Sequence, residues 1–118
     1  MTVAEGDIDG GRLLADAQSE VVEATDRLFD QLLQVPEDPR ERLYQAMRHA
    51  AIGGGKRLRP LLVRAAGDLY HVDRNLSLRV GAAVEAMHVY SLIHDDLPCM
   101  DDDDLRRGKP TVHRAYDE

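Results

Sequence analysis

The sequence predicts an all-α fold. Aromatic residues make up only 4% of the 118 residues and tryptophan is absent, so the core must be built from aliphatic side chains and methionine, which suit helices better than a β-sandwich. Apolar residues also recur at helical spacing in successive segments. The 43% hydrophobic content is ordinary for a globular chain, and this length allows one modest core.

The first half of the chain is expected to hold two helices. Residues 1–10 are polar and glycine-containing and are expected to be disordered. A first helix is expected from residue 11 to about Val35, with an apolar face that includes Val21 and Leu28. Asp38 followed by Pro39 predicts an N-cap and a first turn for a second helix, which ends at the glycines of residues 53–55.

Two more helices are expected in the second half. One begins near Pro60 and runs to about residue 71. The longest is capped by Asn75 or Ser77 and ends near Pro98. Its expected apolar face is Val80, Ala83, Val84, Met87, Ser91 and Ile93. Thr111 is expected to cap a further helix that the chain barely begins, so residues 11–118 are expected to be an incomplete single domain.

The negative charge of the chain is concentrated in one stretch. The formal charge is −7, and six of the acidic residues are aspartates that lie within residues 95–104. Such a patch repels nucleic acid and anionic membranes and attracts divalent cations. The single cysteine, Cys99, forms no internal disulfide, and the N-terminus shows neither a signal peptide nor a membrane anchor, so a cytoplasmic protein is expected.

The spacing of the aspartates indicates a metal site. On one helix, His88 and Asp95 share a face about 10 Å apart. Pro98 can break the helix so that Asp101 turns back to face Asp95. Mg²⁺ is favoured over Ca²⁺, because the stretch lacks the glycine and glutamate of a calcium loop. A solvated acidic loop without a metal remains the alternative for the aspartates taken alone.

A basic, glycine-rich segment is the second unusual feature. The stretch GGGKRLRP, from residue 53 to residue 60, offers Lys56, Arg57 and Arg59 ahead of a helix, and Arg106 and Arg107 follow the aspartates. Arginine side chains and helix N-termini both bind phosphate. Taken singly, the glycines could be a simple turn and His88 a core histidine. Together, the carboxylates and the flanking cations predict a cradle for a diphosphate.

These motifs, GGGKRLRP and EAMHVYSLIHDDLPCMDDDDLRRGKPT, resemble those of the trans-isoprenyl diphosphate synthases over about residues 40–118. The resemblance implies the N-terminal portion of an isoprenoid synthase helical bundle. It also implies that Asp95 and Asp101 bind Mg²⁺, or Mn²⁺, that Asp96 supports them, and that Arg106 contacts the allylic diphosphate. These four residues would form the catalytic set.

The same resemblance implies the second substrate site and the reaction. Lys56, Arg59, His88 and Arg107 would hold the diphosphate of isopentenyl diphosphate. An allylic diphosphate, dimethylallyl or geranyl, would ionise to a carbocation that isopentenyl diphosphate attacks. The family is usually homodimeric and has a second aspartate-rich motif beyond these residues, so the chain alone is expected to be inactive.

The resemblance further implies that product length depends on the turn of helix before Asp95. Tyr90 would close the floor of the product channel beside the small Ser91, which favours farnesyl diphosphate (C15) as product. Geranylgeranyl diphosphate (C20) and a core position for Tyr90 remain alternatives. Two other functional hypotheses remain, namely a non-catalytic partner subunit and a plain cation-binding module.

Overall fold

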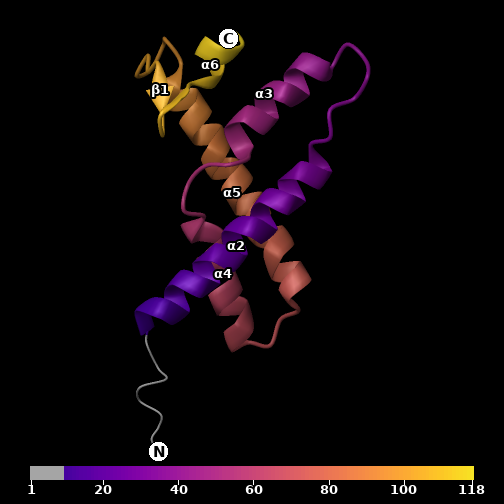
Figure 1. The fold of residues 1–118 in the computed structure, drawn as a ribbon, viewed down its shortest axis with the longest axis vertical. Helices are drawn as coiled ribbons and strands as arrows, with labels where there is room; N and C mark the ends of the chain where they lie inside the picture. The colour runs from indigo at the N-terminus through magenta and orange to yellow at the C-terminus, as the bar shows by residue number, and fades with distance from the viewer. Residues whose placement is uncertain (1–9) are drawn as a thin grey trace, which may run out of the picture.

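The all-α prediction is confirmed by the computed structural model, which describes residues 10–118 (Figure 1). Its elements are α2 (Gly10–Leu32), α3 (Glu41–Ala51), α4 (Leu58–Leu69), α5 (Arg74–Asp96), β1 (Leu105–Arg106), β2 (Lys109–Pro110) and α6 (Val112–Ala115). The disordered segment expected at the N-terminus lies outside the described residues, except for Gly10, which is the first residue of α2.

The antiparallel helices α4 and α5 form the closest packed pair, and α2 crosses both of them (Figure 1). Small residues make this close approach possible. A Cβ on Gly81 of α5 would lie 3.0 Å from the Cα of Pro60, and one on Gly67 of α4 would collide with the hydroxyl of Ser77. The α4–α5 pair therefore forms a rigid base on which α2 and α3 rest.

A compact apolar core forms where α2, α3 and α5 meet. Its buried members are Leu28, Phe29, Ala51, Ala82 and Val89. Ile93 packs against it. The predicted contribution of Leu28 to the apolar face of the first helix is thus confirmed.

The apolar face expected on the longest helix is wrong in part. Val80, Val84 and Met87 are 55%, 42% and 66% exposed, while Ala82 and Glu85 on the other side of α5 are buried. Apolar residues occupy both sides of α5, so their spacing alone did not indicate which side faces α2 and α4. Gly81 determines the orientation, because only a residue without a side chain fits against Pro60.

The expected helix starts also need correction. The α3 helix begins at Glu41, and Asp38 lies in the preceding turn, where its carboxylate accepts a 2.8 Å hydrogen bond from the backbone N–H of Arg40. The α5 helix begins at Arg74 after Asp73, so Asn75 and Ser77 are helical residues and not caps. The expected cap of α5 is two residues too late for Asn75 and four residues too late for Ser77.

The residue before α6 was predicted correctly, but its role differs. Thr111 precedes α6, yet its side chain makes no capping hydrogen bond to that helix. Its hydroxyl instead donates a 2.8 Å hydrogen bond to the carbonyl oxygen of Asp103. Among residues 10–118, no helix is both long and apolar enough to cross a membrane.

Candidate functional site

The chain turns back on itself directly after α5. The helix ends at Asp96, and the residues around Pro98 form a turn. The backbone N–H of Asp101 then donates a 2.9 Å hydrogen bond to the carbonyl oxygen of Asp95, and that of Asp103 donates a 3.1 Å hydrogen bond to Asp96. The predicted return of Asp101 to Asp95 is therefore confirmed for the backbone.

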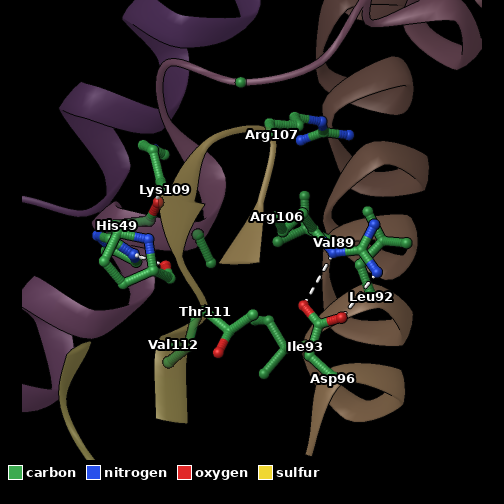
Figure 2. A pocket seen from close by; sticks show the side chains of 13 residues that line it. His49, Val89, Leu92, Ile93, Asp96, Arg106, Arg107, Lys109, Thr111 and Val112 are labelled. Carbon is green, nitrogen blue, oxygen red and sulfur yellow. Dashed lines mark hydrogen bonds and ion pairs between the residues drawn. The ribbon is translucent and has the colours of Figure 1, made fainter. Parts of the chain in front are cut away.

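Arg106 neutralises part of the negative charge of the clustered aspartates. Its Nε and Nη2 atoms each donate a 2.8 Å hydrogen bond to a carboxylate oxygen of Asp96 (Figure 2). The side chain of Asp96 is 6% exposed and that of Arg106 is 34% exposed. The hydrogen bond with Asp96, more than any other contact, raises the pKa of Arg106 above its usual value.

Arg114 balances two further aspartates. Its guanidinium lies 2.6 Å from Asp104 and 3.3 Å from Asp102. Among residues 10–118, the clustered carboxylates that make no ion pair and accept no hydrogen bond are those of Asp95, Asp101 and Asp103. The two carboxylates expected to bind a metal are thus among those that no arginine neutralises.

The carboxylates of Asp95 and Asp101 suit Mg²⁺ better than a cation whose ligands all come from the protein. Asp95 is half-buried at the end of α5, and Asp101 is exposed beside it. Within the described part of the chain, no three His, Cys, Asp or Glu side chains come together in an arrangement that could hold a metal. Mg²⁺ commonly takes one or two carboxylates and completes its shell with water and phosphate oxygens. Asp95 and Asp101 could therefore supply two ligands of such a shell.

A short hairpin follows the aspartates and directs the two arginines to different places. Arg106 pairs with Lys109 across the strands, and the turn consists of Arg107 and Gly108, with φ angles of 54° and 76°. Positive φ at both turn residues is characteristic of a type I′ turn, which matches the twist of a hairpin. Sequence reasoning missed this hairpin, because its strands are only two residues long.

The side chain of Arg107 lies on the glycine-rich segment, away from Asp96 (Figure 2). A Cβ on Gly55 would lie 2.9 Å from Nη2 of Arg107, and one on Gly54 would lie 3.0 Å from Nη1. Gly55 also has a φ of 78°, which side chains rarely adopt. The glycines are therefore needed both for the turn and for the approach of the guanidinium.

The far end of the hairpin is fixed to α3. Lys109 donates a 3.2 Å hydrogen bond from Nζ to the carbonyl oxygen of His49, and the Nε2 atom of His49 lies 2.7 Å from the carbonyl oxygen of Pro110. A small cavity of about 40 Å³ between the hairpin and α5 is lined by apolar side chains such as Val89 and Ile93 (Figure 2). The hairpin is thus joined to α3 through these two hydrogen bonds and to α5 through the pair of Arg106 and Asp96.

The four residues predicted to hold the second diphosphate line one pocket of about 290 Å³. They come from three separate parts of the chain and are Lys56, Arg59, His88 and Arg107. Gly55, Arg57, Leu58 and Glu85 complete the lining. A basic pocket of this kind attracts an anion with several charges.

The environment of His88 favours its neutral form. Burial is the largest cause that lowers the pKa of its imidazole, followed by the positive charge of Arg59. Arg107 and Arg106 lower the pKa further, and Glu85 opposes them. An incoming anion would reverse this balance, since it favours the imidazolium.

Arg57 is not one of the cations available in the pocket, although the sequence places it in the basic segment with Lys56 and Arg59. It is 2% exposed, and its guanidinium contacts Glu85, Asp26 and the carbonyl oxygen of Ala51. Glu85 is the one acidic residue between the start of α5 and Asp95, and this signal could have revealed the pair. A lone carboxylate in an apolar helix needs a buried partner.

The residues predicted to set product length lie on the free side of α5. Tyr90 is 60% exposed, and its ring stacks on that of His94 with 6.1 Å between ring centroids. The hydroxyl of Ser91 donates a 2.7 Å hydrogen bond to the carbonyl oxygen of His88. Tyr90 is therefore outside the core of residues 10–118.

The helical fold and the two charged motifs define a known class. The polyprenyl synthetase family model matches residues 40–118, and the chain belongs to this family. This agrees with the resemblance found in the motifs.

Individual relatives are similar to the chain over part of their length. Farnesyl diphosphate synthase of Bacillus subtilis is 47% identical over 105 residues, which cover 89% of the chain and 34% of the relative. Geranylgeranyl pyrophosphate synthase 4 of Arabidopsis thaliana is 53% identical over 76 residues, covering 64% of the chain and 20% of the relative. The chain therefore spans between about a fifth and a third of the length of these curated relatives.

A solved structure gives the same result. The apo crystal structure of an FPP/GFPP synthase from Zymomonas mobilis superimposes with a TM-score of 0.88 at 66% sequence identity. The match covers 89% of the chain and 38% of that structure. The fold of this chain is thus that of a segment of an isoprenoid synthase.

Proposed function

We propose that the intact protein carrying this chain is a short-chain prenyltransferase. It condenses dimethylallyl or geranyl diphosphate with isopentenyl diphosphate to give farnesyl diphosphate. The observation that carries the proposal is the basic pocket of Lys56, Arg59, His88 and Arg107. Arg107 lies in the turn of the hairpin, and the first strand of this hairpin directly follows the aspartates. The family membership and the farnesyl diphosphate synthase relatives support it.

Each group of residues has one role in this proposal. Asp95 and Asp101 would hold Mg²⁺, or Mn²⁺, which supplies positive charge to the departing allylic diphosphate. Asp96 holds Arg106 in place, and Arg106 presents its remaining N–H groups toward the same diphosphate. The four residues of the basic pocket would bind the diphosphate of isopentenyl diphosphate.

The reaction follows from the separation of charge. The allylic C–O bond breaks, and its electron pair leaves with the diphosphate. The double bond of isopentenyl diphosphate attacks the resulting carbocation, and the new cation then loses a proton, for which the released diphosphate is the proposed acceptor, to restore a double bond. Positive charge fixed beside the leaving group lowers the barrier, because it acts where negative charge develops.

The chain is proposed to be the N-terminal part of a single all-α domain. Coverage of about a third of the B. subtilis relative supports an incomplete domain, and the N-terminal assignment rests on the resemblance of the motifs. A homodimer and a cytoplasmic location belong to the same proposal and rest on the family resemblance. The chain by itself would supply only part of the metal-binding surface.

The test is a condensation assay of the intact protein with dimethylallyl diphosphate and labelled isopentenyl diphosphate in Mg²⁺. We expect product in Mg²⁺, none after chelation with EDTA, and none from purified residues 1–118. An intact, folded protein that forms no prenyl product would contradict the proposal. Turnover by residues 1–118 alone would contradict the expected need for further residues.

Geranylgeranyl diphosphate is the second candidate product. The 53% identity with an Arabidopsis geranylgeranyl pyrophosphate synthase favours this alternative. Separation of the dephosphorylated products by chain length distinguishes C15 from C20. A non-catalytic partner subunit is disfavoured, because Asp95 and Asp101 would then be two mutually repelling carboxylates with no ligand.

A further inference from the structure

Arg57 lies in the middle of the basic segment, but its side chain is buried and its guanidinium is bound by acidic residues. Its Nη1 atom donates a 2.8 Å hydrogen bond to Glu85, and its Nη2 atom donates a 2.9 Å hydrogen bond to Asp26. Nη2 also donates to the carbonyl oxygen of Ala51, and Cζ lies 5.5 Å from the ring centroid of Phe29. Both terminal nitrogens of the guanidinium are therefore bound in the protein interior, while Nε has no hydrogen-bond partner.

Glu85 is the carboxylate that could compete with a ligand for the cations of the pocket. It is the acidic residue in a lining that also contains Lys56, Arg59 and Arg107. Among residues 10–118, none of these three cations makes an ion pair, and the ion pair of Glu85 is with Arg57. Its side chain is 3% exposed, and its Oε1 atom has no hydrogen-bond partner. Glu85 thus has one strong partner and a free acceptor beside three unpaired cations.

The backbone reinforces this arrangement. Arg57 has a φ of 54°, in the left-handed region, and directly precedes α4. A non-glycine residue holds this conformation only when its surroundings fix it. The contacts of the Arg57 side chain supply that constraint in the segment that also carries Lys56 and Arg59.

We propose that Arg57 is a positioning residue that binds Glu85 and so keeps Lys56, Arg59 and Arg107 available for a diphosphate. Without Arg57, the buried carboxylate of Glu85 would turn to one of these cations and compete with the ligand. The inference rests on the proposed function only in that the pocket takes a diphosphate.

Inorganic pyrophosphate in EDTA is the probe, and its binding to the intact protein is measured by calorimetry. Arg57→Met is expected to weaken binding by at least about tenfold, because Glu85 then competes for the cations. Glu85→Gln is expected to tighten binding by about threefold, since one negative charge leaves the pocket. The double variant is expected to recover most of the loss, to within about threefold of the unmodified protein.

The opposite signs of the two single variants separate this role from a merely structural one. A pair that only holds the fold together would make both variants bind more weakly, in proportion to their loss of thermal stability. Arg64→Met is the matched control, because Arg64 forms a 2.8 Å ion pair with Glu20 away from the pocket. It is expected to leave pyrophosphate binding unchanged.

Two outcomes overturn the inference. One is unchanged affinity in a folded Arg57→Met variant, and the other is weaker binding in Glu85→Gln. If Arg57→Met does not fold, Glu85→Gln decides alone, because the sign of its effect still differs between the two roles. Failure of the unmodified protein to bind pyrophosphate would overturn the pocket and the inference together. Absence of prenyl transfer with the expected pyrophosphate pattern would contradict the proposed function only.

Discussion

The carboxylate of Asp96 and the guanidinium of Arg106 form a two-pronged ion pair that joins the end of α5 to strand β1. Both hydrogen bonds measure 2.8 Å, and the acidic partner is buried. Neighbouring Asp95 has no such partner among residues 10–118. Of these two adjacent aspartates, one is bound by an arginine and the other has no ion-pair partner among residues 10–118.

Breaking this ion pair is expected to loosen the hairpin. Asp96→Asn removes the charge opposite Arg106 and should lower the free energy of unfolding by about 1–3 kcal/mol, since Arg106 can partly turn to solvent. Urea unfolding of the intact protein measures this loss. Glu23→Gln is the control, because its exposed pair with Arg27 should contribute less than about 1 kcal/mol. Equal losses would show that the Asp96 pair does not anchor the hairpin.

The two unpaired aspartates Asp95 and Asp103 provide a matched comparison for the metal site. Both lack an ion pair among residues 10–118, so either alanine variant removes one charge without breaking a contact. Asp95→Ala is expected to lower kcat of the intact protein by at least about a hundredfold, a loss typical of removing direct transition-state stabilisation. Asp103→Ala is expected to change it by less than about threefold. Steady-state kinetics in Mg²⁺ measures both, and equal losses would place the site elsewhere.

Diphosphate binding is expected to take up a proton at His88. Burial and then Arg59 hold the pKa of the free imidazole below its usual value, so His88 is neutral at pH 7. A bound anion raises this pKa, and the affinity for pyrophosphate should therefore increase as the pH falls from 8 to 6. His88→Gln gives the slope that belongs to pyrophosphate itself. Identical slopes for the two proteins would show that His88 does not titrate with binding.

The folded-state shift of His88 also has a sign for stability. Because the pKa is lowered on folding, the neutral imidazole favours the folded state above the unfolded pKa. This contribution is lost as the pH falls through the folded pKa. The effect should be absent in His88→Gln when unfolding is followed against pH.

Product length is expected to respond to Tyr90. Its ring is exposed on the free side of α5, one turn before Asp95, where a growing chain could meet it. Tyr90→Ala should shift the product of the intact protein from C15 toward C20 or longer, because a bulky barrier is removed. Tyr70→Ala is the control, since Tyr70 is 81% exposed at the end of α4. An unchanged product in Tyr90→Ala would place the floor of the channel elsewhere.

The sequence predicted the helices well, because helical periodicity and breakers such as Pro98 act locally. It did not predict which side of α5 is buried. That choice depends on the contact of Gly81 with Pro60, which are distant in sequence. Periodicity cannot distinguish two apolar sides of one helix when the deciding contact comes from another helix, here α4.

The candidate site was predicted in part, and for two different reasons. The turn of Asp101 back to Asp95 follows from Pro98 and the spacing of the aspartates. The assembly of Lys56 and His88 in one pocket came from the family resemblance, since no local signal joins residues so far apart. Arg57 was grouped with the other cations of the basic segment, and the lone Glu85 of α5 was the signal that could have indicated its buried partner.

The type I′ turn at Arg107 and Gly108 has a consequence for how two substrates would meet. Arg106 contacts Asp96 and Arg107 lies on the glycine-rich segment, so two adjacent residues carry the side chains that would serve the two proposed diphosphate sites. Inserting a single residue here would turn one arginine to the opposite face of the hairpin. In the proposed enzyme, the native two-residue turn would therefore set the distance between the electrophilic carbon and the double bond that attacks it. No motion of whole helices would be needed to align them.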